Sequence, residues 1–201
     1  MIRQLLNPYN YSPAESMCVN AANNNWDRRT NCIITLKENL NTYFDTEQGE
    51  KCCYCGLLYD RTGRGEIEHI APKGQQNYPQ FTFTPNNLAK ACQLCNSSSM
   101  KHTFDTVRTP HADYNQCDFK IVHPYLDDHN DHYRFAYGFL NVTISVNNNS
   151  DKARESIRLF ELASEKRTRA RAIQRHQERL ENFYNLSENI KRRIKSVIKK
   201  R

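Results

Sequence analysis

The 201-residue sequence has few features of a secreted or membrane-bound protein. No run approaches the roughly 18 apolar residues that a membrane-spanning helix needs. The first residues, MIRQLLNPYNYSP, also lack the apolar stretch of a signal peptide. The sequence therefore predicts a cytoplasmic protein with no membrane partner.

Apolar residues are scarce as well. Only 38% of the residues are hydrophobic and the mean hydropathy is −0.86, so we do not expect a large apolar core. A small domain with a modest core commonly depends on disulfides or a bound metal. The chain has eight cysteines, and in a cytoplasmic protein their Cys-x-x-Cys spacing favours a metal site over disulfides.

This cysteine spacing predicts a structural zinc site. Two knuckles, Cys52-x-x-Cys55 and Cys92-x-x-Cys95, together offer the four thiolates that suit tetrahedral Zn²⁺. Cys53 is an alternative ligand with poorer spacing, and two unrelated pairs of buried thiols are the alternative to a metal site. We interpret the isolated cysteines as small apolar residues; they are Cys18, Cys32 and Cys117.

Between the knuckles lie residue types that suit phosphodiester hydrolysis. Glu68 and His69 end a short segment that reads as a strand, while Asn87 and Asn96 flank the second knuckle. Glu68 and Asn96 can offer oxygen ligands to a hard cation, and a neutral His69 can take a proton from an attacking water. The alternative is that Glu68 and His69 form only a structural pair beneath a zinc knuckle.

Residues 51–104 resemble the HNH endonucleases of the ββα-metal type, in the subgroup whose catalytic unit is held by four zinc-binding cysteines. The resemblance implies an α+β fold with a ββα-metal, treble-clef-like core, extended by an N-terminal helix and a C-terminal helical region. It rests on the two knuckles, on Glu68-His69-Ile70 with Pro72, on Asn87-Leu88 and on Asn96.

The same resemblance implies a role for each site residue. His69 is expected to be the general base, and Asn87 to brace the loop that holds it. Glu68 and Asn96 are expected to bind a catalytic Mg²⁺ or Mn²⁺, in addition to the structural Zn²⁺. Phosphate contact is expected from residues after the second knuckle, namely Lys101 or His102.

Two departures from the family pattern leave an alternative open. Glu68 stands where many members carry Asp or His, and the lysine that usually follows the last Asn appears later, at Lys101. A catalytically inactive zinc module that binds nucleic acid or a partner is therefore the rival hypothesis. DNA is favoured as the substrate by the resemblance alone, and RNA is not excluded by the chemistry.

A second resemblance extends over nearly the whole chain. The chain is similar to the HNH nucleases of Septu-type and retron-associated anti-phage systems. The similarity lies in the segments around the knuckles, in HPYLDD and in KARESIRLFELASEKRTRAR. This resemblance implies the effector nuclease of a bacterial defence complex that works beside an ATPase partner.

The C-terminal region is strongly basic. Residues 151–201 hold 16 Lys or Arg against 7 Asp or Glu, within a chain of net charge +7. We expect residues 165–180 to contact phosphates through Arg167, Arg171 and Arg175 and residues 187–201 to dock a partner, although a solvated helical surface would explain the same charge.

Local patterns predict the organisation of the rest. Residues 31–46 show the apolar stripe of an amphipathic helix, residues 132–146 read as a hairpin, and Pro85 starts a predicted helix that carries the second knuckle. Serines are expected to cap three C-terminal helices, at Ser150, Ser164 and Ser187. The predicted divisions are an N-terminal loop and helix (1–50), the HNH core (51–105), a loop and hairpin (106–149) and a basic helical extension (150–201).

Overall fold

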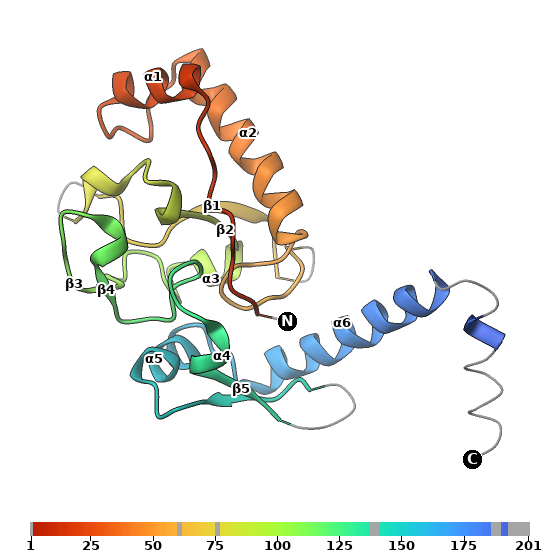
Figure 1. Cartoon of the computed structure of the whole chain (residues 1–201). Helices are drawn as coiled ribbons and strands as arrows, with labels where there is room; N and C mark the ends of the chain where they lie inside the picture. The colour runs from red at the N-terminus through yellow and green to blue at the C-terminus, as the bar shows by residue number, and fades with distance from the viewer. Residues whose placement is uncertain (1, 60–61, 75–76, 137–140, 186–189, 193–201) are drawn as a thin grey trace.

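A computed structural model describes residues 2–59, 62–74, 77–136, 141–185 and 190–192. Helices and short two-stranded sheets alternate along the chain, so the fold is α+β (Figure 1). The helices are α1 (Pro13–Ala22), α2 (Asn31–Gln48), α3 (Gln93–Asn96), α4 (His129–His132), α5 (Asp151–Leu159) and α6 (Glu165–Tyr184). The strands are β1 (Gly65–His69), β2 (Leu88–Cys92), β3 (Val107–Thr109), β4 (Asp118–Phe119), β5 (Tyr133–Phe135) and β6 (Ile144–Val146).

Two helices precede the central sheet. In α2 the predicted apolar stripe is confirmed in part: Ile33, Leu36, Leu40 and Phe44 are buried, whereas Ile34 is exposed. The helix α1 was not anticipated, although its signal is present in the sequence. Ser12 and Glu15 form a reciprocal capping box around Pro13 at the first turn, which satisfies amide groups that would otherwise lack partners.

The connection between α1 and α2 corrects the interpretation of two cysteines. Cys18 of α1 and Cys32 of α2 form a disulfide with a Cα–Cα distance of 6.1 Å, rather than packing as free apolar side chains. The prediction failed because the two residues are not spaced as a recognisable pair, and only the packing of α1 against α2 brings them together. The disulfide closes the loop that contains Trp26.

The central element is the antiparallel pair β1 and β2. Its register places Glu68 opposite Ala89 and His69 opposite Leu88, so both predicted site residues lie at one end of the sheet. The prediction of a helix from Pro85 was wrong. Pro85 begins only a 3-10 turn, the chain then runs through β2, and the short helix α3 starts after Cys92. Leu88, Ala89, Lys90 and Ala91 are all buried, as in a strand that is covered on both faces.

The C-terminal half covers the opposite side of the sheet. β5 pairs with β6, in agreement with the predicted hairpin, and Ser150 and Ser164 cap α5 and α6 through their side chains. The predicted cap at Ser187 lies outside the described residues. In Figure 1, α6 starts beside α5 and runs outward from the body of the protein.

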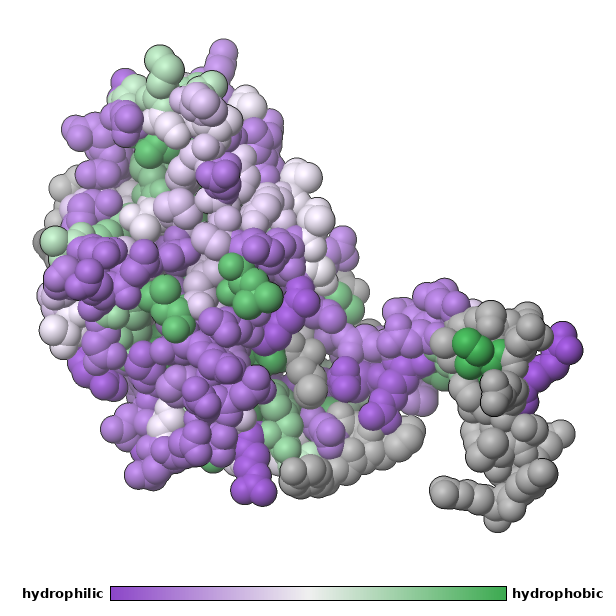
Figure 2. All heavy atoms as spheres, viewed as in Figure 1, coloured by the Kyte–Doolittle hydropathy of each residue, from purple (hydrophilic) through white to green (hydrophobic). Residues whose placement is uncertain are grey.

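The core is divided between two clusters of buried side chains. The larger contains the knuckle cysteines and extends through the C-terminal half, and the smaller joins α1 and α2 to β2 through Leu88. The face shown in Figure 2 is mainly hydrophilic, with small separate hydrophobic patches. None of the described helices combines the length and the apolar character needed to cross a lipid bilayer.

Candidate metal centre and adjoining pocket

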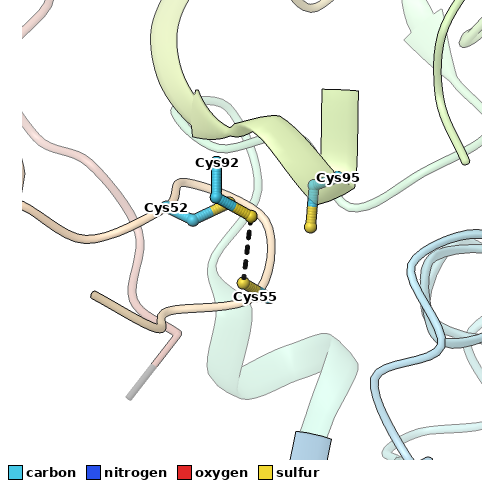
Figure 3. A group of neighbouring side chains, drawn as sticks. All are labelled: Cys52, Cys55, Cys92 and Cys95. Carbon is cyan, nitrogen blue, oxygen red and sulfur yellow. Dashed lines mark hydrogen bonds between the residues drawn. The ribbon is translucent and has the colours of Figure 1, made fainter. Parts of the chain in front are cut away.

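The two cysteine knuckles meet as the sequence predicts. The Sγ atoms of Cys52, Cys55, Cys92 and Cys95 all lie within 4.8 Å of one another, and all four residues are buried (Figure 3). Cys55 Sγ lies 3.9 Å from Cys92 Sγ, close to the edge of about 3.8 Å in a tetrahedron with Zn–S bonds of about 2.3 Å. Gly56 has a φ of 68°, which lets the first knuckle turn tightly. The four thiols therefore fit a structural Zn²⁺.

One arginine of α6 lies against this cluster. Arg167 donates hydrogen bonds to Cys55 Sγ at 3.3 Å and to Cys95 Sγ at 3.2 Å. Burial by itself lowers the pKa of Arg167, but the negative charges of Cys55 and Cys95 outweigh burial and raise it. Four thiolates around one Zn²⁺ carry a net charge of −2, which a buried guanidinium partly neutralises. Arg167 is only 4% exposed, so its predicted contact with phosphate is wrong.

The prediction for Arg171 is also wrong, for the same reason. Arg171 is 1% exposed and donates to the carbonyl oxygens of Val142 and Leu162. Burial lowers its pKa to about 10. One turn further on, Gln174 donates to the carbonyl oxygen of Gly56 at 3.0 Å. Some of the basic side chains of α6 thus point into the protein, and the polar groups on this side attach the helix to the first knuckle.

A pocket of about 320 Å³ lies beside the metal centre and gathers most of the predicted catalytic residues. Glu68, His69 and Asn96 line it, together with Lys101 and His102. β1 supplies the first two residues, and α3 supplies Asn96. Asn96 follows Cys95 directly, and neighbouring residues on a helix point about 100° apart. One residue therefore faces the thiol cluster while the next faces the pocket.

The ring of His69 has a defined tautomer. Its Nε2 lies 3.1 Å from the carbonyl oxygen of Thr82, and because a carbonyl oxygen can only accept, Nε2 must carry the proton. Nδ1 then keeps the lone pair in the neutral ring. Burial, followed by the charges of Lys73 and Lys101, lowers the pKa of His69 to about 3. The ring is neutral at pH 7, which is the state that a general base requires.

Glu68 is buried and already has partners. Its Oε1 lies 2.5 Å from Lys101 Nζ and accepts a hydrogen bond from Tyr54 at 3.0 Å. Lys101 Nζ also donates to the carbonyl oxygen of His69 at 2.9 Å. Burial raises the pKa of Glu68, and Lys101 opposes that shift. Lys101 therefore holds the end of β1 together, which differs from the exposed phosphate contact that we expected.

The amide of Asn96 is oriented by a carboxylate that the sequence reasoning missed. Asn96 Nδ2 donates to Glu66 Oε2 at 3.0 Å, and Arg64 donates to Glu66 Oε1 at 2.8 Å. An ionised carboxylate can only accept, so the amide nitrogen must face Glu66 and Oδ1 must point away from it. The signal was the period of two along a strand, which puts Glu66 and Glu68 on one face of β1.

Asn87 fixes the loop that follows His69. Its Oδ1 accepts from the amide of Ala71 at 2.6 Å, and its Nδ2 donates to the carbonyl oxygens of Ala71 at 3.2 Å and Phe81 at 2.9 Å. Tyr114 donates a further bond to Oδ1 at 3.0 Å. These contacts fix the positions of Ala71 and Phe81 relative to Asn87.

A buried histidine stands behind Asn87. His123 Nε2 lies 2.8 Å from the hydroxyl of Tyr114, and its Nδ1 accepts from the amides of Tyr125 and Leu126. Two amide donors fix the lone pair on Nδ1, so Nε2 donates to Tyr114 and Tyr114 in turn donates to Asn87. The polar chain therefore runs without interruption from His123 to the loop after His69.

The remaining predicted phosphate contacts lie apart from one another. His102 is exposed at the rim of the pocket. Arg175 is half-buried, with Nη1 at 3.3 Å from Glu178 Oε2 on the next turn of α6. Neither position tests the expected contact with nucleic acid.

No protein-family model matches the chain. The chain is similar to protein Ea31 of Escherichia phage lambda, with 32% identity over 89 residues, or 43% of this chain. The matched region spans about a quarter of the length of that relative, 25%.

Proposed function

We propose that this chain is a metal-dependent endonuclease of the HNH, ββα-metal class that hydrolyses phosphodiester bonds in nucleic acid, with DNA as the favoured substrate. The observation that carries the proposal is the state of His69: its Nε2 proton is held by the carbonyl oxygen of Thr82. Nδ1 is therefore the basic atom of a neutral ring in a pocket lined by Glu68 and Asn96. That arrangement suits proton abstraction from water.

The local order of elements supports the same class. The strands β1 and β2 are followed by the short helix α3, and the thiol cluster joins the segment before β1 to the end of β2 and to α3. We infer that this unit is a ββα-metal core held by Zn²⁺. The zinc ion would act in folding rather than in hydrolysis, because four thiolates leave no open coordination position for substrate.

The donor atoms in the pocket suit a hard divalent cation. The carboxylate of Glu68 and the amide oxygen of Asn96 are oxygen ligands of the kind that Mg²⁺ and Mn²⁺ prefer. The chemistry that such an ion supplies when bound is stabilisation of charge on the leaving oxygen. His69 would accept the proton of the attacking water at Nδ1, while Asn87 keeps the following loop in place. Lys101 holds both the carboxylate and the main chain beside His69.

A cleavage assay tests the proposal. Purified wild-type protein is incubated with plasmid, single-stranded DNA and total RNA, with and without Mg²⁺ or Mn²⁺, beside His69→Ala. The proposal requires cleavage that depends on the divalent ion and that His69→Ala removes while the zinc content stays the same. Full activity in the variant would reject His69 as the base. The panel also decides between DNA and RNA.

One observation favours the rival function, a zinc module that binds nucleic acid or protein without hydrolysis. Glu68 Oε1 is paired with Lys101 at 2.5 Å. A carboxylate whose charge is already balanced in this way can serve the structure without binding a metal ion. Calorimetric titration of zinc-loaded protein with Mn²⁺ separates the two functions. If the chain is a nuclease, Mn²⁺ should bind to the zinc-loaded protein, and Asn96→Ala should weaken that binding. If the chain is only a binding module, no Mn²⁺ binding is expected.

We further propose that the nuclease works within a bacterial anti-phage complex beside an ATPase partner. The support is the resemblance of HPYLDD and of residues 152–171 to the nucleases of Septu-type and retron-associated systems. In the structure the first of these segments contains His123, the last member of the polar chain behind Asn87. Cleavage assays with and without the product of the adjacent gene test this assignment.

A further inference from the structure

A second pocket adjoins the one that contains His69. It is lined by residues 22–28, between α1 and α2, and by Lys73 and Gly74. Lys73 and Gly74 also line the first pocket. The two pockets therefore adjoin at these residues, and we call the two together the Lys73 groove, which extends from His69 to the connection between α1 and α2.

Trp26 lines the second pocket and contacts His69, which lines the first. Its ring meets the ring of His69 edge-on, with centroids 4.5 Å apart, and lies against Phe83 at 5.5 Å. Lys37 Nζ lies over the Trp26 ring, 4.8 Å from its centroid. The N-terminal segment is thus in direct contact with the proposed base.

Basic side chains lie in and beside the groove. Lys73 lines both pockets, Lys37 lies over the Trp26 ring, and Arg29 directly follows the lining residue Arg28. Burial lowers the pKa of Lys37; the nearby negative charge of Asp27 opposes this shift, and the positive charges of Lys73 and Arg29 add to it. Lys73 pairs with Asp27 at 3.2 Å. Within the described part of the chain, no ion pair joins Arg29 or Lys37 to an acidic side chain. Cations held near one another attract a polyanion, because each neutralised phosphate releases counterions.

The rest of the lining suits nucleic acid as well. Asn23, Asn24 and Asn25 line the second pocket, and their amides can donate to phosphate oxygens or to base edges. Asn23 and Asn24 have φ values of 50° and 58°, a left-handed conformation that asparagine adopts more readily than most residues. The chain can therefore turn there and still present polar side chains to the groove.

We propose that the Lys73 groove binds the phosphates of the substrate strand next to the cleaved bond, through Lys73 in its lining and through Arg29 and Lys37 beside it. The inference rests on the proposed function and names where the substrate lies. It places the nucleic acid on the N-terminal segment and β1, in place of the inward face of α6 that holds Arg167 and Arg171. A strand longer than the pocket around His69 would be held by these contacts.

Binding of an oligonucleotide tests the groove without requiring cleavage. The probe is a fluorescein-labelled single-stranded DNA of about 20 nucleotides, longer than the usual site of one binding module. Its affinity for the zinc-loaded full chain is measured by anisotropy over a range of salt, without added Mg²⁺ or Mn²⁺. The test variant is Arg29→Gln with Lys73→Gln. The matched control is Lys166→Gln with Arg169→Gln, which removes two exposed charges from α6.

The proposal requires that affinity for the oligonucleotide falls in the test variant and stays at the wild-type value in the control. Two lost phosphate contacts lower the slope of log affinity against log salt by about 1.4, which is about a twentyfold loss of affinity at about 0.1 M salt. Equal affinity in the test variant and wild type, or an equal loss in the control, would overturn the proposal. Should the double variant fold poorly, Lys37→Gln gives the same readout with about half the change in slope.

The same measurement keeps the two proposals apart. Oligonucleotide binding that depends on Arg29 and Lys73, combined with no cleavage under any divalent ion, would retain the groove and reject the nuclease. Cleavage that depends on His69, combined with affinity that is indifferent to Arg29 and Lys73, would retain the nuclease and overturn the groove.

Discussion

The side chain of Asn87 holds the main chain of Ala71 on both sides, accepting from its amide at 2.6 Å and donating to its carbonyl oxygen at 3.2 Å. Ala71 lies two residues after His69, so this contact fixes where the loop leaves β1. Asn87 is fully buried, so these bonds are shielded from bulk solvent. The geometry of the proposed base therefore depends on a residue that does not touch it.

Substitution of Asn87 by aspartate should show this dependence. Asn87→Asp keeps the shape but replaces two donated bonds, to Ala71 and Phe81, with repulsion between oxygens. We expect the free energy of unfolding to fall by about 2–3 kcal/mol and cleavage to fall with it. Urea unfolding of zinc-loaded protein measures the first effect. Asn86→Asp, at the half-buried neighbouring position, is the control, and an equal loss there would contradict the brace.

The contact between Arg167 and the thiol cluster predicts an effect on zinc affinity. Arg167→Leu removes the donors to Cys55 and Cys95 and leaves the negative cluster without its buried cation. Loss of a partner of this kind typically weakens metal binding about 10- to 100-fold. Competition with a chromogenic chelator measures the affinity. Arg169→Leu, on the exposed face of the same helix, should bind zinc as wild type does; a similar loss in both variants would refute the role of Arg167.

The carboxylate of Glu66 predicts an effect on the divalent cation. Glu66→Gln offers the amide of Asn96 both a donor and an acceptor, so the amide can turn and present its nitrogen to the pocket. We expect Mn²⁺ affinity to fall about tenfold, as for other residues that orient a metal ligand, with zinc content unchanged. Calorimetry on the zinc-loaded protein gives both values. Unchanged Mn²⁺ affinity would show that Glu66 does not orient Asn96.

The buried His123 predicts how stability depends on pH. Burial lowers its pKa to about 3, below the value of about 6.5 in an unfolded chain. The folded state therefore favours neutral His123, and this contribution is complete above about pH 6.5 and is lost as the pH falls toward 3. Between pH 7 and pH 5 the loss is about 2 kcal/mol.

Comparison with His123→Asn isolates that contribution. Protonation of the cysteine thiols lowers stability in both proteins, so the difference between their pH dependences reports on His123. We expect the unfolding free energy of the variant to fall less between pH 7 and pH 5 than that of the wild type. Parallel curves would show that His123 is not held neutral.

The sequence predicts the grouping of the site residues better than it predicts the contacts that surround them. The thiol cluster was predictable because knuckle spacing constrains each pair of ligands locally, and α2 because its apolar stripe is regular. The assignment of Cys92 to a helix failed because the five-residue segment Leu88–Cys92 is buried throughout and shows no clear hydrophobic period, so only its pairing with β1 identifies it as a strand. This error concerns local secondary structure and does not change which residues come together at the site.

The contacts across the fold could not be predicted. In the sequence, Arg167 is one of many basic residues of a helix. Only the packing of α6 against the knuckles shows that its guanidinium donates hydrogen bonds to the thiol cluster. Cys18 and Cys32 likewise become a pair only when α1 and α2 lie side by side. Trp26 meets His69 across 43 residues of sequence, and no local pattern predicts such a meeting.

The rate of plasmid cleavage by His69→Ala tests the central claim most directly. With zinc-loaded protein in excess over supercoiled plasmid and Mg²⁺ or Mn²⁺ present, loss of a general base should slow cleavage about 10²- to 10⁴-fold. His176→Ala, on the exposed surface of α6, should cleave as wild type does. Equal rates for His69→Ala and His176→Ala, at equal zinc content, would contradict the assignment of His69 as the base.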